Sequence, residues 1–367
     1  MYEYSHGGNA AFEPGNAYID LSANINPLGL PEGITSAVSE ALAAATSYPD
    51  SFSRQLRLSI AGFEGVDPEW IFCGNGASDI IFRLPRAINA RKVMVTAPAF
   101  SDYERAAASF GSLLARHYLQ RDEGFQITDD ILESIAEQRP DLLFICNPNN
   151  PTGQLTDKRL LARIIEICEQ QQCYLAIDEC FLDLTEQAEQ LSCKDLLAQS
   201  PRLLLVKAFT KAFAMPGIRL GYAISANAGL LQGLYQHGPD WPVSNLAQAA
   251  GLAALESPDQ YLQDSRGYIA KTRLMLEGRL AELGYRVYKA SANYVFLHSP
   301  FAFDLQAELD SCGIRIRSCA NYHGLGEGYY RIAVSTPANN DRLLAALARI
   351  HEQKAAPELL QTVSRLP

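Results

Sequence analysis

The sequence has no hydrophobic run of membrane-spanning length and no excess of positive charge. Its 367 residues carry a formal net charge of −10 and the pI is near 5.2, so the chain as a whole repels nucleic-acid phosphates and anionic lipid surfaces. No stretch approaches the roughly 18 apolar residues of a membrane span, and "MYEYSHGGNAAFEPGNAYIDL" has neither the basic start nor the apolar core of a signal peptide. These absences predict a cytoplasmic protein that binds neither nucleic acid nor membrane.

Paired cysteine motifs are also missing. No two of the eight cysteines form a C-x-x-C pair, and most of them fall in apolar stretches. We therefore expect reduced thiols in the core rather than disulfides or metal ligands, and no metal site. The cysteines are residues 73, 146, 168, 173, 180, 193, 312 and 319.

What the sequence does contain is an alternation of short apolar runs and longer helical patterns between about residues 70 and 225. The runs are "WIFCG", "KVMVTA", "DLLFICN", "YLAIDE", "RLLLVKA" and "RLGYAIS", separated by segments such as "DKRLLARIIEICEQQQ" with helical spacing. Continuously apolar runs are typical of strands buried on both faces. The pattern predicts an α/β fold, with a mostly parallel sheet flanked by helices.

Beyond this region the pattern changes to a long helical stretch followed by β-like runs such as "YVFLHS" and "YYRIAVS". We interpret residues 250–367 as a smaller α+β C-terminal domain and residues 41–249 as the large domain. Residues 1–40, which are rich in Gly, Asn and Pro, are predicted to form an N-terminal arm that also contributes to the small domain.

Ligands of open α/β sheets bind beyond the carboxyl ends of the strands, so the residues that follow each run are the candidates. "GNGASD" follows the first run, and a glycine turn that opens a helix suits a phosphate through Gly76, Ala77 and Ser78. By itself this motif is equally explained as a plain turn. Asn150 in "NPNNPTG" follows the third run and has the same alternative, because Asn-Pro pairs are common in turns.

Charged residues follow the next runs. Asp178 ends an apolar strand, where a carboxylate is costly unless it has a cationic or protonated partner. A structural salt bridge is the alternative to a functional role for this residue. Lys211 follows "RLLLV", and an enclosed lysine can act as a nucleophile or form a Schiff base, although most lysines are solvated. Arg219 lies eight residues later, across a turn, where it would bind a phosphate. Lys207 competes for the reactive role but lacks an arginine at that offset.

One ligand requires these parts together. Pyridoxal 5′-phosphate needs an amine for its aldehyde, a carboxylate beside its ring nitrogen, a donor for its ring oxygen and a phosphate cup. Lys211, Asp178 and Asn150 would supply the first three, and Arg219 with the glycine turn the fourth. Their joint occurrence at successive strand ends is more specific than any single motif.

"GNGAS", "NPNNPTG", "IDECF" and "FTKAF" with "GIRLGY" resemble the fold-type I pyridoxal-phosphate enzymes with the aspartate-aminotransferase-like fold. The resemblance implies a homodimer with shared active sites, in which Tyr48 reaches the cofactor phosphate of the other subunit. It also implies that Phe100 stacks on the cofactor ring and that Arg331 binds the substrate carboxylate. The family usually has Ser or Thr where this chain has Ala208, and Thr210 is the residue that would compensate.

Within the family, the chain is similar to the branch of histidinol-phosphate aminotransferases and threonine-phosphate decarboxylases. "HGGN", "LSANINPLGLP" and "IRSCANYHGL" favour the decarboxylase, as does Phe181 where the aminotransferases have tyrosine. The resemblance then implies decarboxylation of L-threonine O-3-phosphate to (R)-1-amino-2-propanol O-2-phosphate in cobalamin biosynthesis. A histidinol-phosphate-type aminotransferase using 2-oxoglutarate is the alternative, and a non-catalytic cofactor-binding module is a third reading.

The substrate phosphate needs a polar or positive lining of its own. The candidates are His6, Asn24, Arg315 and Arg317, with Asn150 and Arg331 also facing the substrate. Alternate residues of a strand point the same way, so the two arginines at 315 and 317 are expected to form a pair suited to a dianion, unless they are solvated. Phosphoserine is not separated from phosphothreonine by the sequence, because one methyl group contributes little discrimination.

Overall fold

The structure is a computed structural model that describes residues 7–8 and 18–363, with side chains described up to residue 354. Its largest sheet has seven strands in the order β2-β8-β7-β6-β5-β3-β4. β8 is antiparallel to both of its neighbours and the other adjacent pairs are parallel, so the predicted α/β class with a mostly parallel sheet is confirmed. The strands are β2 Ile71–Gly74, β3 Lys92–Ala97, β4 Leu113–Tyr118, β5 Leu142–Cys146, β6 Tyr174–Asp178, β7 Leu203–Ala208 and β8 Gly221–Ile224.

The sequence pattern indicated six of these strands and missed β4. This strand lies at the sheet edge, pairs only with β3 in the sheet and reads "LLARHY". Leu113 and Tyr118 at its ends are exposed. An edge strand with a solvated face needs no continuous apolar run, and so the rule that found the central strands did not apply to it.

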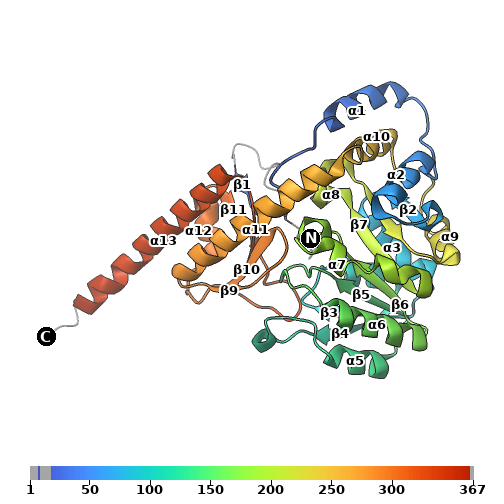
Figure 1. The fold of residues 1–367 in the computed structure, drawn as a ribbon. Coiled ribbons are helices and arrows are strands. Elements are labelled where there is room, and N and C mark those ends of the chain that lie inside the picture. The colour runs from blue at the N-terminus through green and yellow to red at the C-terminus, as the bar shows by residue number, and fades with distance from the viewer. Residues whose placement is uncertain (1–6, 9–17, 364–367) are drawn as a thin grey trace.

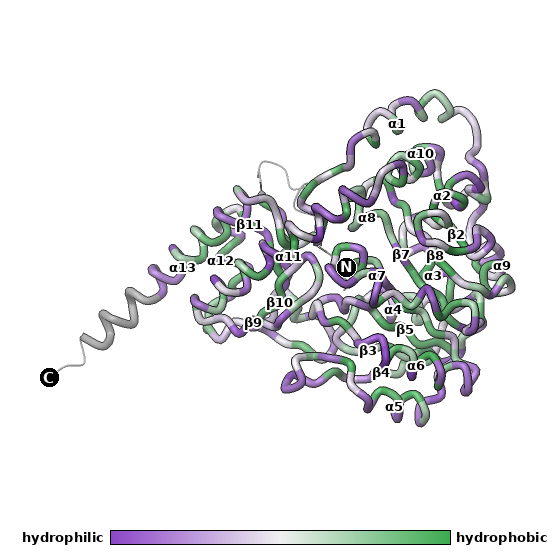
Figure 2. The backbone as a smooth tube through the Cα atoms, viewed as in Figure 1, coloured by the Kyte–Doolittle hydropathy of each residue, from purple (hydrophilic) through white to green (hydrophobic). Residues whose placement is uncertain are grey.

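Helices cover both faces of the large sheet. α3, α4 and α9 pack on one face in a cluster that includes Phe72, Phe144 and Val206, and α2, α5 and α6 pack on the other with Ile145 and Ile177. In Figure 2 the central strands are mostly hydrophobic while the helices alternate along their length, as amphipathic helices do. All eight cysteines are free thiols and seven are buried, as predicted. The helices are α1 Ile34–Ala41, α2 Arg54–Glu64, α3 Ala77–Ala87, α4 Asp102–Phe110, α5 Asp130–Gln138, α6 Lys158–Gln170, α7 Ala188–Leu191, α8 Phe209–Ala212, α9 Ala228–Gln236, α10 Asn245–Ala254, α11 Pro258–Glu282, α12 Leu305–Ser311 and α13 Pro337–Val363.

The C-terminal part forms a second, smaller layer. Its antiparallel sheet has the order β12-β13-β10-β9, and the long helix α11 runs from the large sheet to this one (Figure 1). β1 of the N-terminal segment pairs in parallel with β11, so the arm adds a strand to the C-terminal part. No helix among the described residues is long and apolar enough to cross a membrane. The strands are β1 Ile19–Asp20, β9 Arg286–Tyr288, β10 Tyr294–His298, β11 Ile314–Arg315, β12 Arg317–Ser318 and β13 Tyr329–Ala333.

Candidate active site

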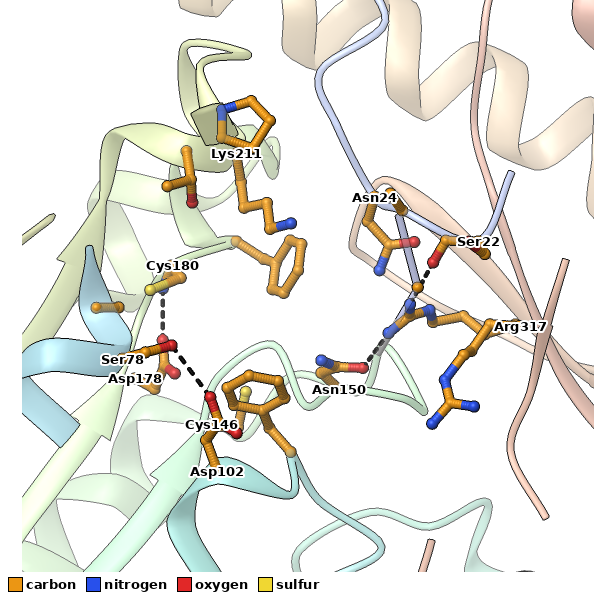
Figure 3. Close-up of a pocket in the computed structure, with 18 of the residues that line it drawn as sticks. Ser22, Asn24, Ser78, Asp102, Cys146, Asn150, Asp178, Cys180, Lys211 and Arg317 are labelled. Carbon is orange, nitrogen blue, oxygen red and sulfur yellow. Dashed lines mark hydrogen bonds between the residues drawn. The ribbon is translucent and has the colours of Figure 1, made fainter. Parts of the chain in front are cut away.

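A pocket lies between the carboxyl ends of the large-sheet strands, the small antiparallel sheet and the N-terminal segment. Figure 3 shows Lys211 entering it from one side, with Asp178 and Ser78 on the large-sheet wall, Asn24 and Arg317 on the facing wall, and Asn150 on the loop after β5 between them. The topology explains this gathering, because parallel strands deliver their carboxyl ends to one edge. The residues predicted from sequence that line the pocket are Asn24, Ala77, Ser78, Phe100, Asn150, Asp178, Thr210, Lys211, Arg219, Arg317 and Arg331.

The start of α3 and the guanidinium of Arg219 form a cup. Gly76 precedes the helix with φ +78°, and a Cβ there would lie 2.6 Å from Arg219 Nη2. A Cβ on Gly221 would lie 2.5 Å from the backbone nitrogen of Ala77. Glycine at both positions therefore lets Arg219 approach the free N–H groups of the first helical turn, which is a favourable arrangement for a phosphate. The Ser78 hydroxyl donates to Asp102 Oδ2 at 3.1 Å.

Lys211 is half-buried, and its amine has no anionic partner among the described residues. Its Nζ lies 5.9 Å from the ring centre of Phe181. Burial, assisted by the positive charges of Arg331 and Arg219, lowers the pKa of Lys211 to about 8. The competing Lys207 does not line this pocket and forms ion pairs on the other face of the sheet. Lys211 is thus the lysine that is poised to act as a nucleophile.

Asp178 is held by two donors at the end of β6. Tyr103 Oη donates to its Oδ2 at 2.7 Å, and the Cys180 N–H donates to its Oδ1 at 3.0 Å. Burial raises the pKa of Asp178, while these hydrogen bonds act in the opposite direction. Sequence reasoning missed Tyr103, because nothing in the "SDYERAAASF" segment connects it to a strand end 75 positions away.

Arg331 of β13 is buried in the same pocket as Lys211 and joins the loop after β5 to the N-terminal segment. Its guanidinium donates to Asn150 Oδ1 and, at 2.7 Å, to the carbonyl oxygen of Ser22. Arg331 Nε and Asn24 Oδ1 are buried and have no hydrogen-bond partner among the described residues. Buried polar atoms in this state are costly unless a ligand satisfies them, so this wall is suited to a polar ligand.

The two candidate arginines at 315 and 317 do not come together, which corrects the prediction that they form a pair. The chain leaves β11 after Arg315 and enters β12 at Arg317, so the two residues belong to different sheets and the alternation rule does not apply across the break. Arg317 lines the pocket, 5.3 Å from the ring centre of Tyr322, a residue that sequence reasoning missed. Arg315 is instead bound by Asp310 at 2.7 Å.

Two further predicted residues lie outside this pocket as it is described. Tyr48 is 79% exposed and stacks on Trp241 with ring centres 4.3 Å apart. It does not line the pocket of its own chain. His6 lies outside the described residues.

The family model for aminotransferase class I and II matches residues 16–347. The chain belongs to this family. It is 35% identical to the threonine-phosphate decarboxylase of Salmonella typhimurium over 95% of this chain and 97% of the relative. It is 30% identical to an adenosylcobalamin biosynthesis bifunctional protein of Leptospira interrogans, over 94% of this chain and 41% of that protein. The crystal structure of histidinol-phosphate aminotransferase from Clostridium acetobutylicum superposes with a TM-score of 0.84 at 29% identity, covering 91% of this chain and 99% of that one.

The cofactor of this family of aminotransferases is pyridoxal 5′-phosphate, and the pocket residues fit it. The cup at Gly76 and Arg219 suits the phosphate, and the buried Asp178 carboxylate suits a protonated ring nitrogen. Lys211 supplies an amine of lowered pKa for the aldehyde. Phe100 lines the same space and offers a ring face. This chain is therefore a pyridoxal-phosphate enzyme.

The lowered pKa of Lys211 predicts how the apoprotein captures the cofactor. Only the neutral amine attacks the aldehyde, so the capture rate should rise with pH up to about 8 and then level off. An unperturbed lysine would instead give a rate that keeps rising to about pH 10.4. Stopped-flow absorbance of apoprotein mixed with pyridoxal phosphate measures this profile. A rate that still rises beyond pH 9 would contradict the description of Lys211.

Proposed function

We propose that this enzyme decarboxylates L-threonine O-3-phosphate to (R)-1-amino-2-propanol O-2-phosphate, a reaction of cobalamin biosynthesis. The observation that carries the proposal is the pair of guanidiniums, Arg331 and Arg317, which line the same pocket as Lys211. They offer separate sites for the carboxylate and the phosphate of one small substrate. Similarity to the Salmonella decarboxylase over nearly the full length of both chains supports the same reaction.

Each pocket residue has a distinct task in this reaction. Bound pyridoxal phosphate supplies the electron sink that accepts the electron pair of the broken Cα–carboxylate bond. Arg331 would bind the substrate carboxylate and so orient the Cα–carboxylate bond that breaks when CO2 is released. Asp178 keeps the proton on the ring nitrogen. Lys211 Nζ then delivers a proton to Cα, which completes the replacement of CO2 by hydrogen.

A histidinol-phosphate-type aminotransferase is the second candidate, supported by the structural similarity to the Clostridium enzyme. Arg331, Asp178 and Lys211 would serve that reaction equally. Phe181, whose ring centre lies 5.9 Å from Lys211 Nζ, stands where the aminotransferases have tyrosine, and this likeness to the decarboxylases favours the first candidate.

One experiment separates the two. The purified holoenzyme is incubated with L-threonine O-phosphate in the absence of any keto acid, and CO2 release is followed. Multiple turnovers are expected for the decarboxylase. No CO2, combined with amino transfer from histidinol phosphate once 2-oxoglutarate is added, would establish the aminotransferase. L-serine O-phosphate run in parallel reports the discrimination for the methyl group, for which a 10- to 200-fold preference is about what one methyl provides.

The separation of Arg317 from Arg315 gives a matched pair of variants. Arg317→Met should raise the KM for L-threonine O-phosphate by about 10- to 100-fold, because a charge-assisted contact with the phosphate is lost. Arg315→Met removes the same charge two residues away but should change KM by less than about threefold, since Arg315 pairs with Asp310 instead. Steady-state kinetics of both variants test this. Equal effects would mean that Arg317 does not bind the phosphate.

We also propose that the enzyme is a homodimer in which Tyr48 completes the partner's active site. An aromatic residue that is 79% exposed, yet stacked on Trp241, is already oriented at the surface and available to a second copy. Sedimentation velocity of the holoenzyme tests the assembly, and a monomer that is fully active would contradict it. The cytoplasmic location stays a prediction.

A further inference from the structure

A buried ion cluster lies behind the pocket, on the opposite face of the large sheet. Lys207 Nζ lies 2.7 Å from Glu64 Oε1 and 2.8 Å from Asp183 Oδ1. All three residues are buried. None of them lines the active-site pocket, so the roles assigned above do not use them.

The strand geometry explains why Lys207 faces away from the cofactor. Its neighbour Val206 packs in the cluster with α3 and α4, so Lys207 must point to the other face. In the antiparallel pair of β7 and β8, Lys207 lies directly opposite Tyr222, whose hydroxyl also contacts Glu64. The cluster therefore ties together the end of α2, the two strands and the segment that contains Asp183.

Both segments joined by this cluster lead directly into the active site. Lys207 precedes Lys211 by four residues, and Asp183 follows Phe181 by two. The ring centre of Phe181 lies 5.9 Å from Lys211 Nζ. The ion pair between Lys207 and Asp183 thus joins the two segments whose side chains meet at the reactive amine.

Neighbouring contacts make the arrangement rigid. Arg266 of α11 donates from Nε to the backbone oxygen of Asp183 at 2.8 Å. At the other end of α8, Asn26 Nδ2 donates to the carbonyl oxygen of Ala212 at 2.8 Å. Lys207 therefore holds one end of the short segment that carries Lys211, while Asn26 holds the other.

The charge of Lys207 persists despite burial. Burial alone would lower the pKa of Lys207, but the carboxylates of Asp183 and Glu64 outweigh it and hold the pKa above its usual value. An uncharged side chain would leave these two carboxylates buried without their shared cation, and they would repel each other. Lys194, 3.8 Å from Glu64, and Arg266, bound to the Asp183 carbonyl oxygen, would remain, but neither joins Asp183 to β7, so we expect the segment with Asp183 and Phe181 to shift.

We propose that Lys207 is a positioning residue, which holds Phe181 against Lys211 by clamping Asp183 and Glu64 from the rear of the sheet. It touches neither substrate nor cofactor. Its effect on the reaction passes through the placement of the Lys211 amine and of the ring beside it. The proposal rests on Lys211 being the lysine that binds the cofactor.

The test uses holoenzyme variants and a readout that needs no substrate, the pH midpoint at which the absorbance of the lysine-bound cofactor titrates. Lys207→Met should shift this midpoint by about one unit and lower kcat roughly 10- to 100-fold, with KM changed less than about threefold. Lys207→Arg, which keeps the charge, should recover most of both. In the double variant Glu64→Gln with Lys207→Met, thermal stability should largely return while the midpoint stays shifted.

The absorbance midpoint and the melting temperature of Lys207→Met, compared with those of a destabilised control variant, distinguish a positioning role from a general loss of stability. Leu161→Ala, in the buried face of α6, should lower thermal stability by leaving a cavity, but it removes no charge or hydrogen bond of the ion cluster and should leave the midpoint unchanged. The proposal is overturned if Lys207→Met lowers only the melting temperature, or if Leu161→Ala shifts the midpoint equally. If Lys207→Met does not fold, Asp183→Asn, which removes one clamped charge with little change of volume, carries the same expectations.

Borohydride reduction followed by peptide mapping separates this proposal from the assignments on which it rests. If the reduced cofactor is found on Lys211 and the variants have an unshifted absorbance midpoint, only the clamp by Lys207 is refuted. If the reduced cofactor is found on Lys207, both the clamp and the assignment of Lys211 as the cofactor-binding lysine are refuted. The identity of the substrate affects neither measurement.

Discussion

Lys211→Ala is expected to reduce decarboxylation by about 10⁴-fold or more, the largest effect of any substitution considered. In the proposed reaction the amine both captures the cofactor and returns the proton to Cα, and no other lysine lines the pocket among the described residues. Its lowered pKa of about 8 reflects a site built to hold a neutral amine. CO2 release and the absorbance of the lysine-bound cofactor measure the two losses separately.

Lys271→Ala is the matched control, since Lys271 is an exposed lysine of α11. It should behave as the unsubstituted enzyme does. Small amines added to Lys211→Ala should restore part of the proton transfer, and the recovered rate should follow the basicity of the amine. Undiminished turnover of Lys211→Ala would refute its catalytic role and revive the reading of the chain as a non-catalytic cofactor-binding module.

Asp178→Asn is expected to lower kcat by roughly 10²- to 10³-fold, the cost of losing one preorganised charge beside the reacting system. The carboxylate is buried and held by Tyr103 and Cys180, so its geometry should survive the substitution. An amide cannot stabilise the proton on the ring nitrogen, and the cofactor then becomes a weaker electron sink. Steady-state CO2 release measures the effect.

Tyr103→Phe provides the graded comparison. It removes one hydrogen bond to Asp178 but leaves the charge, so the decrease in kcat should be only about tenfold. A cofactor methylated on its ring nitrogen carries a permanent positive charge and should recover part of the activity of Asp178→Asn. Failure of both variants to slow the reaction would show that Asp178 does not act through the ring nitrogen.

The main active-site residues were predictable because their positions follow from local rules. A continuous apolar run indicates a buried strand, and neighbouring parallel strands end at one edge. Asp178 ends one such run and Lys211 follows the next, so the order of strands brings them together, while Arg219 lies just before the antiparallel strand β8 and reaches the same edge from the opposite direction. The missed strand β4 shows the limit of the rule, because an edge strand with mixed polarity carries no such signal.

Contacts between distant segments were not predictable. Tyr103 reaches Asp178 from α4, and Arg331 meets the carbonyl oxygen of Ser22 across 309 positions. The predicted pairing of Arg315 with Arg317 was wrong because the chain changes sheets between them, which a two-residue periodicity does not register. Such contacts depend on how helices and strands pack against each other, and the sequence pattern of one segment does not determine that packing.

The sequence by itself determined the α/β class, the strand ends that carry the chemistry and the cofactor they suit, since each depends on short-range periodicity and residue type. The sequence favoured Lys211 over Lys207, but only the tertiary structure decided where Lys207 lies, paired with two carboxylates behind the sheet and outside the pocket. Lys207 and Lys211 differ in their environments, one beside two carboxylates and one beside two arginines and an aromatic ring. Burial and neighbouring charge set the reactivity of an amine, and both arise only when distant segments meet.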